Sequence, residues 1–320
     1  MEHRQKSLIM CVTPLQILIA EKIIQSRPTE DFDVIIFGLE NNQKFNYYAE
    51  KLKKYAKAYW YSHVVYKSSI YNLINFLKFI FQFSFNGFNK KYDNYYLSSI
   101  DSRYFQYILS KKTNSSSVFT FDDGTANIVK TSIYYLRNLN DEKKNKIFKS
   151  LGIKYFQDDI KSMSKLHYTI YPQFENIIEN TKEIKLFNNN VKNKVRDKCL
   201  NIFLGQPYEE FDSNLSADNI EKLMDQLNID LYFPHPREKN NIKNVENVNT
   251  KKIFEDYIVD FLDRNEDCYL NIYTFMSSAA LNVKSFDSIN IYFIQTHTLI
   301  NKYPDFFNML KNHNFNILEF

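Results

Sequence analysis

The sequence predicts an α/β fold built from two Rossmann-like lobes that face a central cleft. The first observation behind this prediction is the opening, where an apolar run, a proline-containing turn and an amphipathic stretch lead into a second apolar run. The second is that the same succession of patterns begins again near residue 200. A β-turn-α-β start is typical of an open parallel sheet. Two such starts in 320 residues fit two domains of about 150 residues each.

The first lobe is predicted to span residues 1–190. Residues 8–12 are apolar, as expected for a strand buried on both faces, and Pro14 stands in the first turn of a helix over 15–25 that ends before Pro28. Apolar runs predict further strands at 33–39, 58–66, 92–98 and 117–121. Helical patterns predict helices at 46–57, 70–85, 103–110 and 140–150.

The second lobe is predicted to span residues 191–320, because the polar stretch from about 181 to 198 has the composition of a linker. Its predicted strands are 200–204, 229–233, 268–274 and 289–293. Its predicted helices are 214–227, 254–262 and 278–283. Strands and helices alternate again, which favours a second parallel sheet.

Composition excludes several classes of function. The chain has five glycines and contains neither G-x-G-x-x-G nor G-x-x-x-x-G-K-[ST], so both standard glycine loops for phosphate are absent. A net charge of +4 is too weak to indicate a dedicated nucleic-acid binder. Three isolated cysteines favour a reducing cytoplasm over disulfides or a zinc site. No apolar run is long enough to span a bilayer, and polar residues interrupt the first one, which argues against a signal peptide.

The residues that follow predicted strands are the candidates for function, because ligands of parallel sheets bind beyond the carboxyl ends of the strands. Asp122, Asp123 and Gly124 come directly after the strand at 117–121, and Thr13 follows the strand at 8–12. One of the two carboxylates could act as a general base or orient a sugar hydroxyl. The alternative is an Asx turn that only closes the strand.

The second lobe offers groups for an anion. His235 stands between two prolines after a predicted strand, and Arg237 adds a permanent cation, so this loop could stabilise a leaving phosphate. Ser277 and Ser278 stand at a strand-to-helix junction, where hydroxyls and helix N–H groups bind anions. The alternatives are a hydrogen-bonded strand-end histidine and an ordinary helix cap.

Other patterns are interpreted as structural. Asp31-Phe32-Asp33 has the D-x-D spacing of a metal-bound diphosphate site, but it precedes its predicted strand, at the end of the sheet where ligands do not normally bind. Asp158-Asp159 is interpreted as a solvated turn, and His167 is expected to pack or to hydrogen-bond. The sequence therefore predicts no metal site. Residues 70–85 are interpreted as a core-packed helix, with a membrane-surface face as the alternative.

Seven stretches together carry a resemblance to a known family. They are residues 11–16 (CVTPLQ), 121–127 (FDDGTAN), 167–170 (HYTI), 203–207 (FLGQP), 234–238 (PHPRE), 254–257 (FEDY) and 273–280 (YTFMSSAA). In this order they resemble the bacterial lipooligosaccharide and capsule sialyltransferases of glycosyltransferase family 52. The resemblance implies a GT-B-type fold, a CMP-sialic acid donor, an acceptor that ends in galactose, and no metal cofactor.

The resemblance also implies roles for individual residues. His235 and Pro236 are expected near the CMP phosphate, together with Ser277 and Ser278. Gly205, Gln206, Arg237 and Glu255 are expected on the donor side, and Thr13, Asp122 and Gly124 on the acceptor side. The family's candidate base is a carboxylate in the loop after residues 203–207. Asp212 is the choice here, while Glu209, Glu210 and, from the first lobe, Asp123 stay open.

The predicted function is that of an inverting sialyltransferase that acts on a bacterial surface glycan, either lipooligosaccharide or capsule. An α2,3 linkage to galactose is expected, with α2,6 left open. The alternatives are a glycosyltransferase that uses another sugar nucleotide and an inactive scaffold of a polysaccharide-assembly complex. No nucleic-acid partner is expected. Peripheral contact with the inner face of the cell membrane and a homodimer are further expectations for a cytoplasmic protein of this kind.

Overall fold

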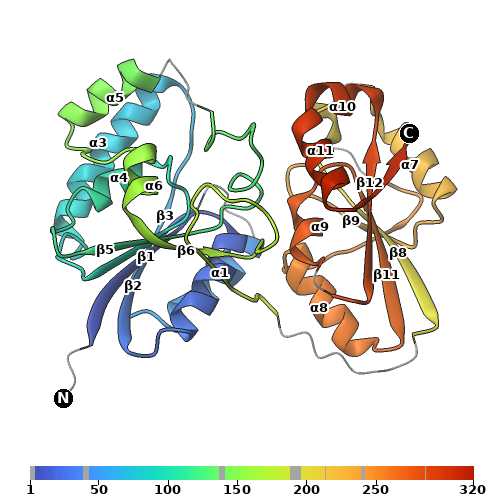
Figure 1. The fold of residues 1–320 in the computed structure, drawn as a ribbon, viewed down its shortest axis with the longest axis horizontal. Coiled ribbons are helices and arrows are strands. Elements are labelled where there is room, and N and C mark those ends of the chain that lie inside the picture. Colours follow the sequence, from blue (N-terminus) through green and yellow to red (C-terminus); the bar gives the residue numbers. More distant parts are fainter. Residues whose placement is uncertain are drawn as a thin grey trace. The chain divides into compact units, whose positions relative to one another are not determined.

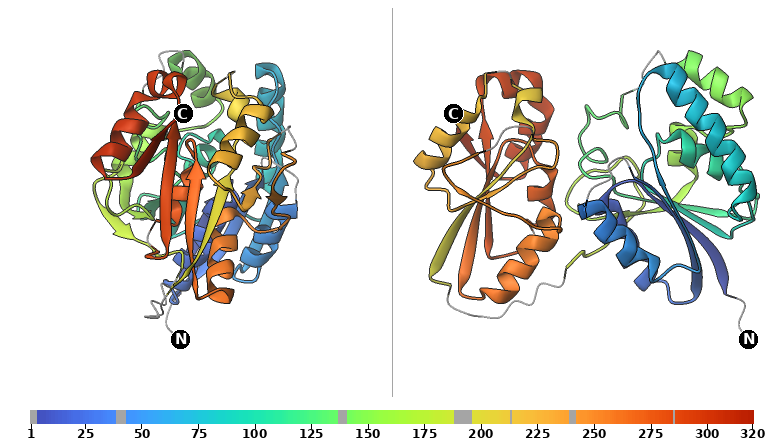
Figure 2. Two further views of the ribbon diagram at one scale, coloured as in Figure 1. Left: turned by 90° about the vertical axis from the view of Figure 1, so that its right-hand side faces the viewer. Right: turned by 180° about the vertical axis from the view of Figure 1, so that it is seen from behind.

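The computed structural model describes residues 4–38, 43–136, 141–187, 196–212, 214–238, 242–284 and 286–320. The chain divides into two compact units, Met1–Leu186 (unit 1) and Phe187–Phe320 (unit 2). Each unit holds a parallel sheet with helices on both faces (Figures 1 and 2). The predicted arrangement of two Rossmann-like lobes is confirmed. The predicted boundary between residues 190 and 191 lies outside the described residues.

The sheet of unit 1 has seven strands in the order β3-β2-β1-β4-β5-β6-β7. In chain order these are β1 (Gln5–Cys11), β2 (Glu30–Gly38), β3 (Ala58–His63), β4 (Asn94–Leu97), β5 (Ser117–Phe121), β6 (Ser164–Thr169) and β7 (Thr181–Glu183). The helices are α1 (Pro14–Gln25), α2 (Gln43–Lys53), α3 (Ser69–Phe85), α4 (Arg103–Leu109), α5 (Asp141–Ser150) and α6 (Gln157–Met163).

The sheet of unit 2 has six strands in the order β10-β9-β8-β11-β12-β13. These are β8 (Lys198–Leu204), β9 (Leu231–Phe233), β10 (Glu246–Asn247), β11 (Cys268–Thr274), β12 (Ile289–Gln295) and β13 (Asn316–Glu319). The helical segments are the 3₁₀ turn η1 (Tyr208–Glu210), α7 (Ala217–Gln226), α8 (Phe254–Arg264), α9 (Ser278–Asn282), α10 (His297–Lys302) and α11 (Pro304–Asn312).

The strand orders place a topological switch point in the middle of each sheet. In unit 1 the first strand, β1, pairs in parallel with β2 on one side and with β4 on the other. In unit 2 the first strand, β8, pairs in the same way with β9 and β11. The connections on the two sides run to opposite edges, so the loops at the carboxyl ends separate there and leave room for a ligand.

The central strands are apolar because both of their faces are covered. Leu8, Ile9 and Met10 of β1 have no exposed surface, and the same holds for Ile202 of β8. Such continuous apolar runs are expected in parallel sheets flanked by helices. The sequence located these strands correctly for that reason, and the first apolar run forms β1 and α1, as expected.

Several sequence interpretations need correction. Asp31-Phe32-Asp33 lies inside β2, which begins at Glu30, although it still lies at the amino end of the strand. Asp158-Asp159 is exposed to solvent, as expected, but forms the first turn of α6, where the Asp159 carboxylate accepts from Phe156 N at 2.9 Å. Residues 181–183 are not a linker, because they form the edge strand β7. Helices α10 and α11 and strand β13 were not predicted.

Helix α3 is only half explained by the interpretation of a core-packed helix. Phe76, Phe79 and Phe83 are buried in the aromatic core of unit 1, where Phe79 meets Trp60 at 5.9 Å between ring centroids. The opposite side of the helix is apolar and exposed. No helix in the described parts of the chain has the length and apolar character needed to cross a membrane.

Candidate active site

The Asp-Asp-Gly turn follows β5 at the carboxyl edge of the unit 1 sheet. Gly124 has a φ of 68°, in the left-handed region that residues with a Cβ seldom adopt. The turn is closed further by Asn127, whose Oδ1 accepts from Asp123 N at 2.6 Å. The backbone therefore requires glycine at this position. The side chains of Asp122 and Asp123, on either side of one peptide bond, point in different directions.

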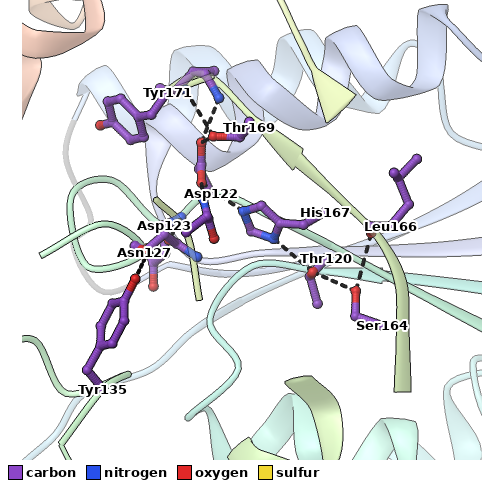
Figure 3. A network of polar contacts seen from close by, with 12 residues as sticks. Thr120, Asp122, Asp123, Asn127, Tyr135, Ser164, Leu166, His167, Thr169 and Tyr171 are labelled. Carbon is purple, nitrogen blue, oxygen red and sulfur yellow. Dashed lines mark hydrogen bonds and ion pairs between the residues drawn. The ribbon is translucent and has the colours of Figure 1, made fainter. Parts of the chain in front are cut away.

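Asp122 lies inside unit 1 and accepts hydrogen bonds from four donors (Figure 3). Its Oδ1 accepts from His167 Nε2 at 2.8 Å and from Asn176 Nδ2 at 3.3 Å. Its Oδ2 accepts from Thr169 Oγ1 at 2.8 Å and from Ile170 N at 2.6 Å. The side chain has no exposed surface. The structure therefore places Asp122 as a brace between β5 and the end of β6, with no face turned to solvent.

A chain of hydroxyl, imidazole and carboxylate runs behind the turn (Figure 3). Thr120 Oγ1 lies 2.8 Å from His167 Nδ1, and His167 Nε2 lies 2.8 Å from Asp122. In the neutral imidazole, a ring proton on Nε2 is donated to the carboxylate and Nδ1 accepts from the threonine hydroxyl. All three side chains have zero exposure. Hydroxyl, imidazole and carboxylate follow one another as in a catalytic triad, but a substrate cannot contact them because all three are buried. The expected hydrogen-bonding role of His167 is confirmed.

Asp123 is the carboxylate of this turn that stays partly exposed. Its Oδ1 accepts from Gln16 Nε2, and its Oδ2 accepts from Ser99 Oγ at 3.0 Å and from Tyr134 OH. Because a carboxylate has about four lone-pair directions, three donors leave it one direction for a further partner. Asp123 is thus both held in place and able to accept another proton donor.

Gln16 is a fully buried side chain that crosses the switch point of unit 1. Its Oε1 accepts from Val12 N at 2.6 Å and from Thr13 N, while its Nε2 donates to Ser99 Oγ at 3.0 Å and to Asp123. Thr13 caps α1 by accepting from Gln16 N, which completes a capping box. The candidate Thr13 thus acts on the site through Gln16.

Gln206 plays the corresponding part in unit 2, after β8. Its Oε1 accepts from Met276 N at 2.7 Å and from Thr274 Oγ1 at 3.3 Å. Thr274 lies at the end of β11, on the other side of the switch point. The side chain therefore joins the loop after β8 to the loop that leads into Ser277 and Ser278.

Glu238, in the loop after β9, accepts a hydrogen bond from the backbone of Gln206 and so joins this loop to the loop after β8. Its Oε1 accepts from Tyr232 OH at 2.5 Å, and its Oε2 accepts from His235 N at 2.8 Å. A Cβ on Gly205 would come within 2.5 Å of Tyr232 OH and 2.7 Å of Glu238 Oε1. Gly205 is therefore glycine because these two side chains lie against its backbone.

Burial raises the pKa of Glu238 to about 7, although hydrogen bonds from Tyr232 and from the backbone of His235 and Gln206 favour the charged form. The same burial raises the pKa of Tyr232 far above its usual range, so the phenol stays protonated and donates. The carboxylate can therefore gain a proton near neutral pH.

His235 has a defined tautomer. Its Nδ1 accepts from Arg237 N at 3.1 Å, which places the ring proton on Nε2. A neutral imidazole of this form donates from Nε2, and an imidazolium would lose the contact with Arg237 N. The Arg237 guanidinium lies 3.3 Å from the Glu210 carboxylate, with both side chains more than half exposed. An exposed pair of this kind is weak and easily exchanged for another anion.

Asp212 is buried, with 3% of its surface exposed, and joins the loop after β8 to the start of α10. Its Oδ2 accepts from Thr296 Oγ1 at 2.9 Å and its Oδ1 from Asn214 N at 3.0 Å. Burial alone would raise the pKa of Asp212, but the hydrogen bonds from Asn214, Thr296 and Thr298 outweigh it and hold the pKa below its usual value. The group is therefore ionised at neutral pH and firmly oriented.

Ser277 caps α9 by accepting from Ala279 N at 3.3 Å. Capping uses an acceptor lone pair of the hydroxyl and leaves its proton to donate. Ser278 follows as the first residue of the helix and is half-buried. The candidate Glu255 lies inside unit 2, where its Oε1 accepts from Asn282 Nδ2 at 2.6 Å and so ties α8 to α9.

The structure thus brings most of the unit 2 candidates to one edge of one sheet. A pocket there is lined by residues of the loops after β8 and β9, namely Gln206, Pro207, Tyr208, Glu209, Glu210, Arg237 and Glu238. Pro236 is exposed beside it. Among the described residues, no three His, Cys, Asp or Glu side chains gather as ligands of one metal ion.

Four positioning residues were missed by reasoning from sequence: Gln16, Tyr134, Glu238 and Thr296. Two of them have partners far along the chain: Gln16 is 107 residues from Asp123, and Thr296 is 84 residues from Asp212. The sequence did contain one indication of a role for Gln16. A threonine followed three residues later by glutamine, as in Thr13 and Gln16, is the pattern of a capping box. Glu238 stands in the stretch 234–238 that carries the family resemblance but was given no role, and no local pattern pointed to Tyr134 or Thr296.

Comparisons with known proteins agree with this architecture. The model of the family described as glycosyltransferase family 52 matches residues 29–298. A Pasteurella multocida protein named CMP-N-acetylneuraminate:beta-galactoside alpha-2,3-sialyltransferase is 36% identical over 278 residues, which cover 87% of each chain. A Haemophilus influenzae N-acetyllactosaminide alpha-2,3-sialyltransferase is 34% identical over 291 residues, or 91% of this chain and 92% of that one.

A solved structure shares the fold without close sequence similarity. UDP-N-acetylglucosamine 2-epimerase from Rickettsia bellii superposes with a TM-score of 0.50 over 92% of this chain and 80% of its own, at 10% identity. At that identity the likeness concerns the fold alone. Together with the two parallel sheets, it confirms the predicted GT-B-type fold class.

Glu238→Gln should remove a pH dependence of stability. A glutamate in the unfolded chain has a pKa near 4.5, and Glu238 in the folded chain has a pKa of about 7. The folded state therefore holds the proton more tightly, so the wild type loses stability as pH rises through this interval, by about 3 kcal/mol at most. Glutamine stays neutral, and its amide can still pair with His235 N and Tyr232 OH.

The measurement is the unfolding temperature at about pH 5 and about pH 8 for the wild type, Glu238→Gln and the exposed control Glu246→Gln. The wild type and the control should lose stability between the two pH values more steeply than Glu238→Gln. An equal loss in all three proteins would show that Glu238 does not titrate in this range.

Proposed function

The chain belongs to glycosyltransferase family 52, and on that basis we propose that it is a sialyltransferase that moves sialic acid from CMP-sialic acid to a terminal galactose. The observation that carries the proposal is similarity at 36% identity to a beta-galactoside alpha-2,3-sialyltransferase over nearly the whole chain. A second such relative, at 34% identity, has the same α2,3 specificity in its name. We therefore propose the α2,3 linkage, with inversion at the anomeric carbon, for an acceptor of the bacterial surface.

The carboxyl edge of unit 2 supplies groups suited to the donor. His235 Nε2–H and the Ser277 and Ser278 hydroxyls are proton donors for oxygens of the CMP phosphate. Gln206 joins the loop after β8 to the loop before Ser277, and Glu238 joins it to the loop that carries His235, so the donors are held before substrate arrives. Arg237 can leave Glu210 and offer its charge to the phosphate.

The reaction that we propose is a single displacement. The acceptor hydroxyl loses its proton to a carboxylate, and its oxygen bonds to the anomeric carbon of sialic acid. The bond from that carbon to the phosphate oxygen breaks, and its electron pair leaves with CMP. Negative charge builds up on the phosphate during this step, and N–H and O–H groups already oriented toward it lower the barrier.

Asp212 is the proposed base, and Asp123 is the alternative. Asp212 is ionised at neutral pH, and Asn214 and Thr296 hold its pKa below the usual value. Such a weak base suffices, because the proton of the acceptor hydroxyl becomes acidic while its oxygen bonds to the cationic sugar. Two observations favour Asp123 as the base: it is more exposed than Asp212, and its carboxylate keeps one lone-pair direction for the acceptor hydroxyl. The other directions accept from Gln16, Ser99 and Tyr134. Glu210 instead forms an exposed pair with Arg237, at 3.3 Å.

We propose that the transfer needs no metal ion. CMP-sialic acid has one phosphate, so the charge that must be stabilised on the leaving group is smaller than in a nucleoside diphosphate sugar. Asp31 and Asp33, the one D-x-D pair considered, are used elsewhere: Asp31 lies 3.0 Å from Arg4, and Asp33 accepts from Tyr92 OH at 2.8 Å.

The proposed acceptor class also suggests where the protein acts. A lipooligosaccharide is held in a membrane by its lipid, so we propose cytoplasmic action at the inner face of the cell membrane, with peripheral contact. A homodimer is proposed from the family resemblance. Two other functions stay as outcomes of the test below: transfer from another sugar nucleotide, and an inactive scaffold.

The activity should appear when the purified protein is incubated with radiolabelled CMP-sialic acid and lactose. We expect labelled sialyl-lactose with an α2,3 linkage, identified by a linkage-specific sialidase, in the presence of excess EDTA as well as without it. Hydrolysis of the donor without transfer would point to another acceptor, and no reaction at all would support a scaffold. Loss of transfer in EDTA with rescue by Mg²⁺ or Mn²⁺ would contradict metal independence.

His235→Ala should lower kcat by about 100-fold or more, because the phosphate loses a donor just as its charge increases. His235→Asn is the sharper variant, since its Oδ1 can still accept from Arg237 N and keep the loop in shape while the Nε2–H is gone. His63→Ala, at an exposed histidine of unit 1, is the control. Turnover of His235→Asn at the wild-type rate would remove His235 from the mechanism.

Asp212→Asn should abolish transfer while CMP affinity, measured by calorimetry, stays close to that of the wild type. The amide keeps the size of the side chain but accepts no proton, and a general base contributes about 10² to 10⁴-fold. Asp123→Asn should raise the KM for acceptor, because Gln16, Ser99 and Tyr134 then hold an amide in place of the carboxylate. If instead Asp123→Asn is inactive at saturating acceptor and Asp212→Asn is active, the base is Asp123.

A further inference from the structure

Tyr134 is a buried tyrosine in the segment after the Asp-Asp-Gly turn, and its hydroxyl lies between two carboxylates. The hydroxyl donates to Asp123 Oδ2 and lies 3.3 Å from Asp101 Oδ1. The side chain has no exposed surface, whereas Ile133 and Leu136 of the same segment are 62% and 59% exposed. Tyr134 therefore turns inward, toward the turn, while these neighbours point to the solvent.

Helix α6 holds the backbone of Tyr134 in place. Gln157 Nε2 donates to Tyr134 O at 3.0 Å and to Ile133 O at 3.1 Å. Lys161 Nζ, about one turn further along the helix, also donates to Tyr134 O. The ring belongs to the same apolar core as Ile160 of α6. Backbone and ring are thus both fixed, so the position of the hydroxyl is set before a ligand binds.

The phenol acts as a hydrogen-bond donor. Burial raises the pKa of Tyr134 well above its usual range, and the charges of Asp123 and Asp101 raise it further, so the hydroxyl keeps its proton. A hydrogen bond from a phenol to a carboxylate is charge-assisted and stronger than one between neutral groups. The bond from Tyr134 is therefore able to fix the orientation of the Asp123 carboxylate.

The donors are distributed unevenly over the two oxygens of Asp123. Each carboxylate oxygen has about two lone-pair directions. Oδ2 accepts from both Ser99 Oγ and Tyr134 OH, which uses both of its directions. Oδ1 accepts from Gln16 Nε2 and keeps one direction. All three donors are neutral, so none of them cancels the charge of the ionised carboxylate.

We propose that Tyr134 is a positioning residue for the acceptor: together with Ser99 it saturates Oδ2 of Asp123 and so leaves Oδ1 as the oxygen that accepts a hydroxyl of the sugar. Without the phenol both oxygens have a free direction, and the carboxylate can turn or bind water in place of the sugar. Tyr134 acts through Asp123 and does not itself touch the acceptor. The proposal deepens the proposed transfer to galactose and rests on it.

Tyr134→Phe removes the hydroxyl and keeps the ring in the core. We expect the KM for lactose to rise about tenfold or more, as for a lost hydrogen bond to a charged group, while kcat at saturating lactose and CMP affinity stay close to those of the wild type. The matched control is Tyr135→Phe, which should leave the KM unchanged. The Tyr135 hydroxyl donates to Asn127 O at 3.1 Å, so it contacts the backbone of the same turn but no carboxylate (Figure 3).

The double variant Tyr134→Phe/Asp123→Asn tests whether Tyr134 acts through Asp123. If it does, the KM of the double variant should match that of Asp123→Asn alone, because effects within one hydrogen-bond network do not add. Effects that multiply independently, an unchanged KM in Tyr134→Phe, or an equal rise in Tyr135→Phe would overturn the proposal. Circular dichroism checks that each variant is folded.

Binding of lactose to the CMP-bound protein, followed by NMR, separates this proposal from the proposed function. Tyr134→Phe should bind lactose more weakly than the wild type, whatever the rate of transfer. Equal binding by the two proteins would overturn this proposal alone. A wild type that neither transfers sialic acid to lactose nor binds lactose would overturn the proposed function, and this proposal with it.

Discussion

One glutamine side chain in each sheet spans the switch point, and the arrangement of the surrounding loops depends on it. Gln16 after β1 reaches Ser99 after β4, and Gln206 after β8 reaches Met276 after β11. At a switch point the backbone does not join neighbouring loops, since their connections run to opposite edges of the sheet. A neutral amide that both donates and accepts can make this link without placing a charge in the interior.

Carboxylates extend these links to the groups that would do chemistry. Asp122 braces the Asp-Asp-Gly turn against β6, and Glu238 holds the His235 loop against Gly205. Buried polar networks of this kind stabilise a structure only when every member has partners. Their rigidity places proton donors and acceptors in advance, which is what a transferase requires, because solvent would otherwise have to reorganise as the charge moves.

The sequence reveals much of this fold because the decisive patterns are local. Buried parallel strands appear as apolar runs, so the bounds of β1, β5 and β11 were predicted closely. Asp123 and His235 were selected because ligands bind beyond the carboxyl ends of parallel strands. The sequence does not show which of the two adjacent carboxylates turns inward, because Asp122 and Asp123 are equivalent in it. The folded position of His167, 45 residues from Asp122, distinguishes them. The period of α3 is visible in the sequence, but which of its two apolar faces meets the core is not.

The central claim is that the donor binds at the carboxyl edge of unit 2, on loops held by Gln206 and Glu238. A crystal structure of the protein with CMP and lactose tests it most directly. The phosphate should accept hydrogen bonds from His235 Nε2 and from Ser277 or Ser278, with the links from Gln206 to Met276 N and from Glu238 to His235 N intact. CMP bound instead at the Asp-Asp-Gly turn of unit 1, away from His235, would contradict the account.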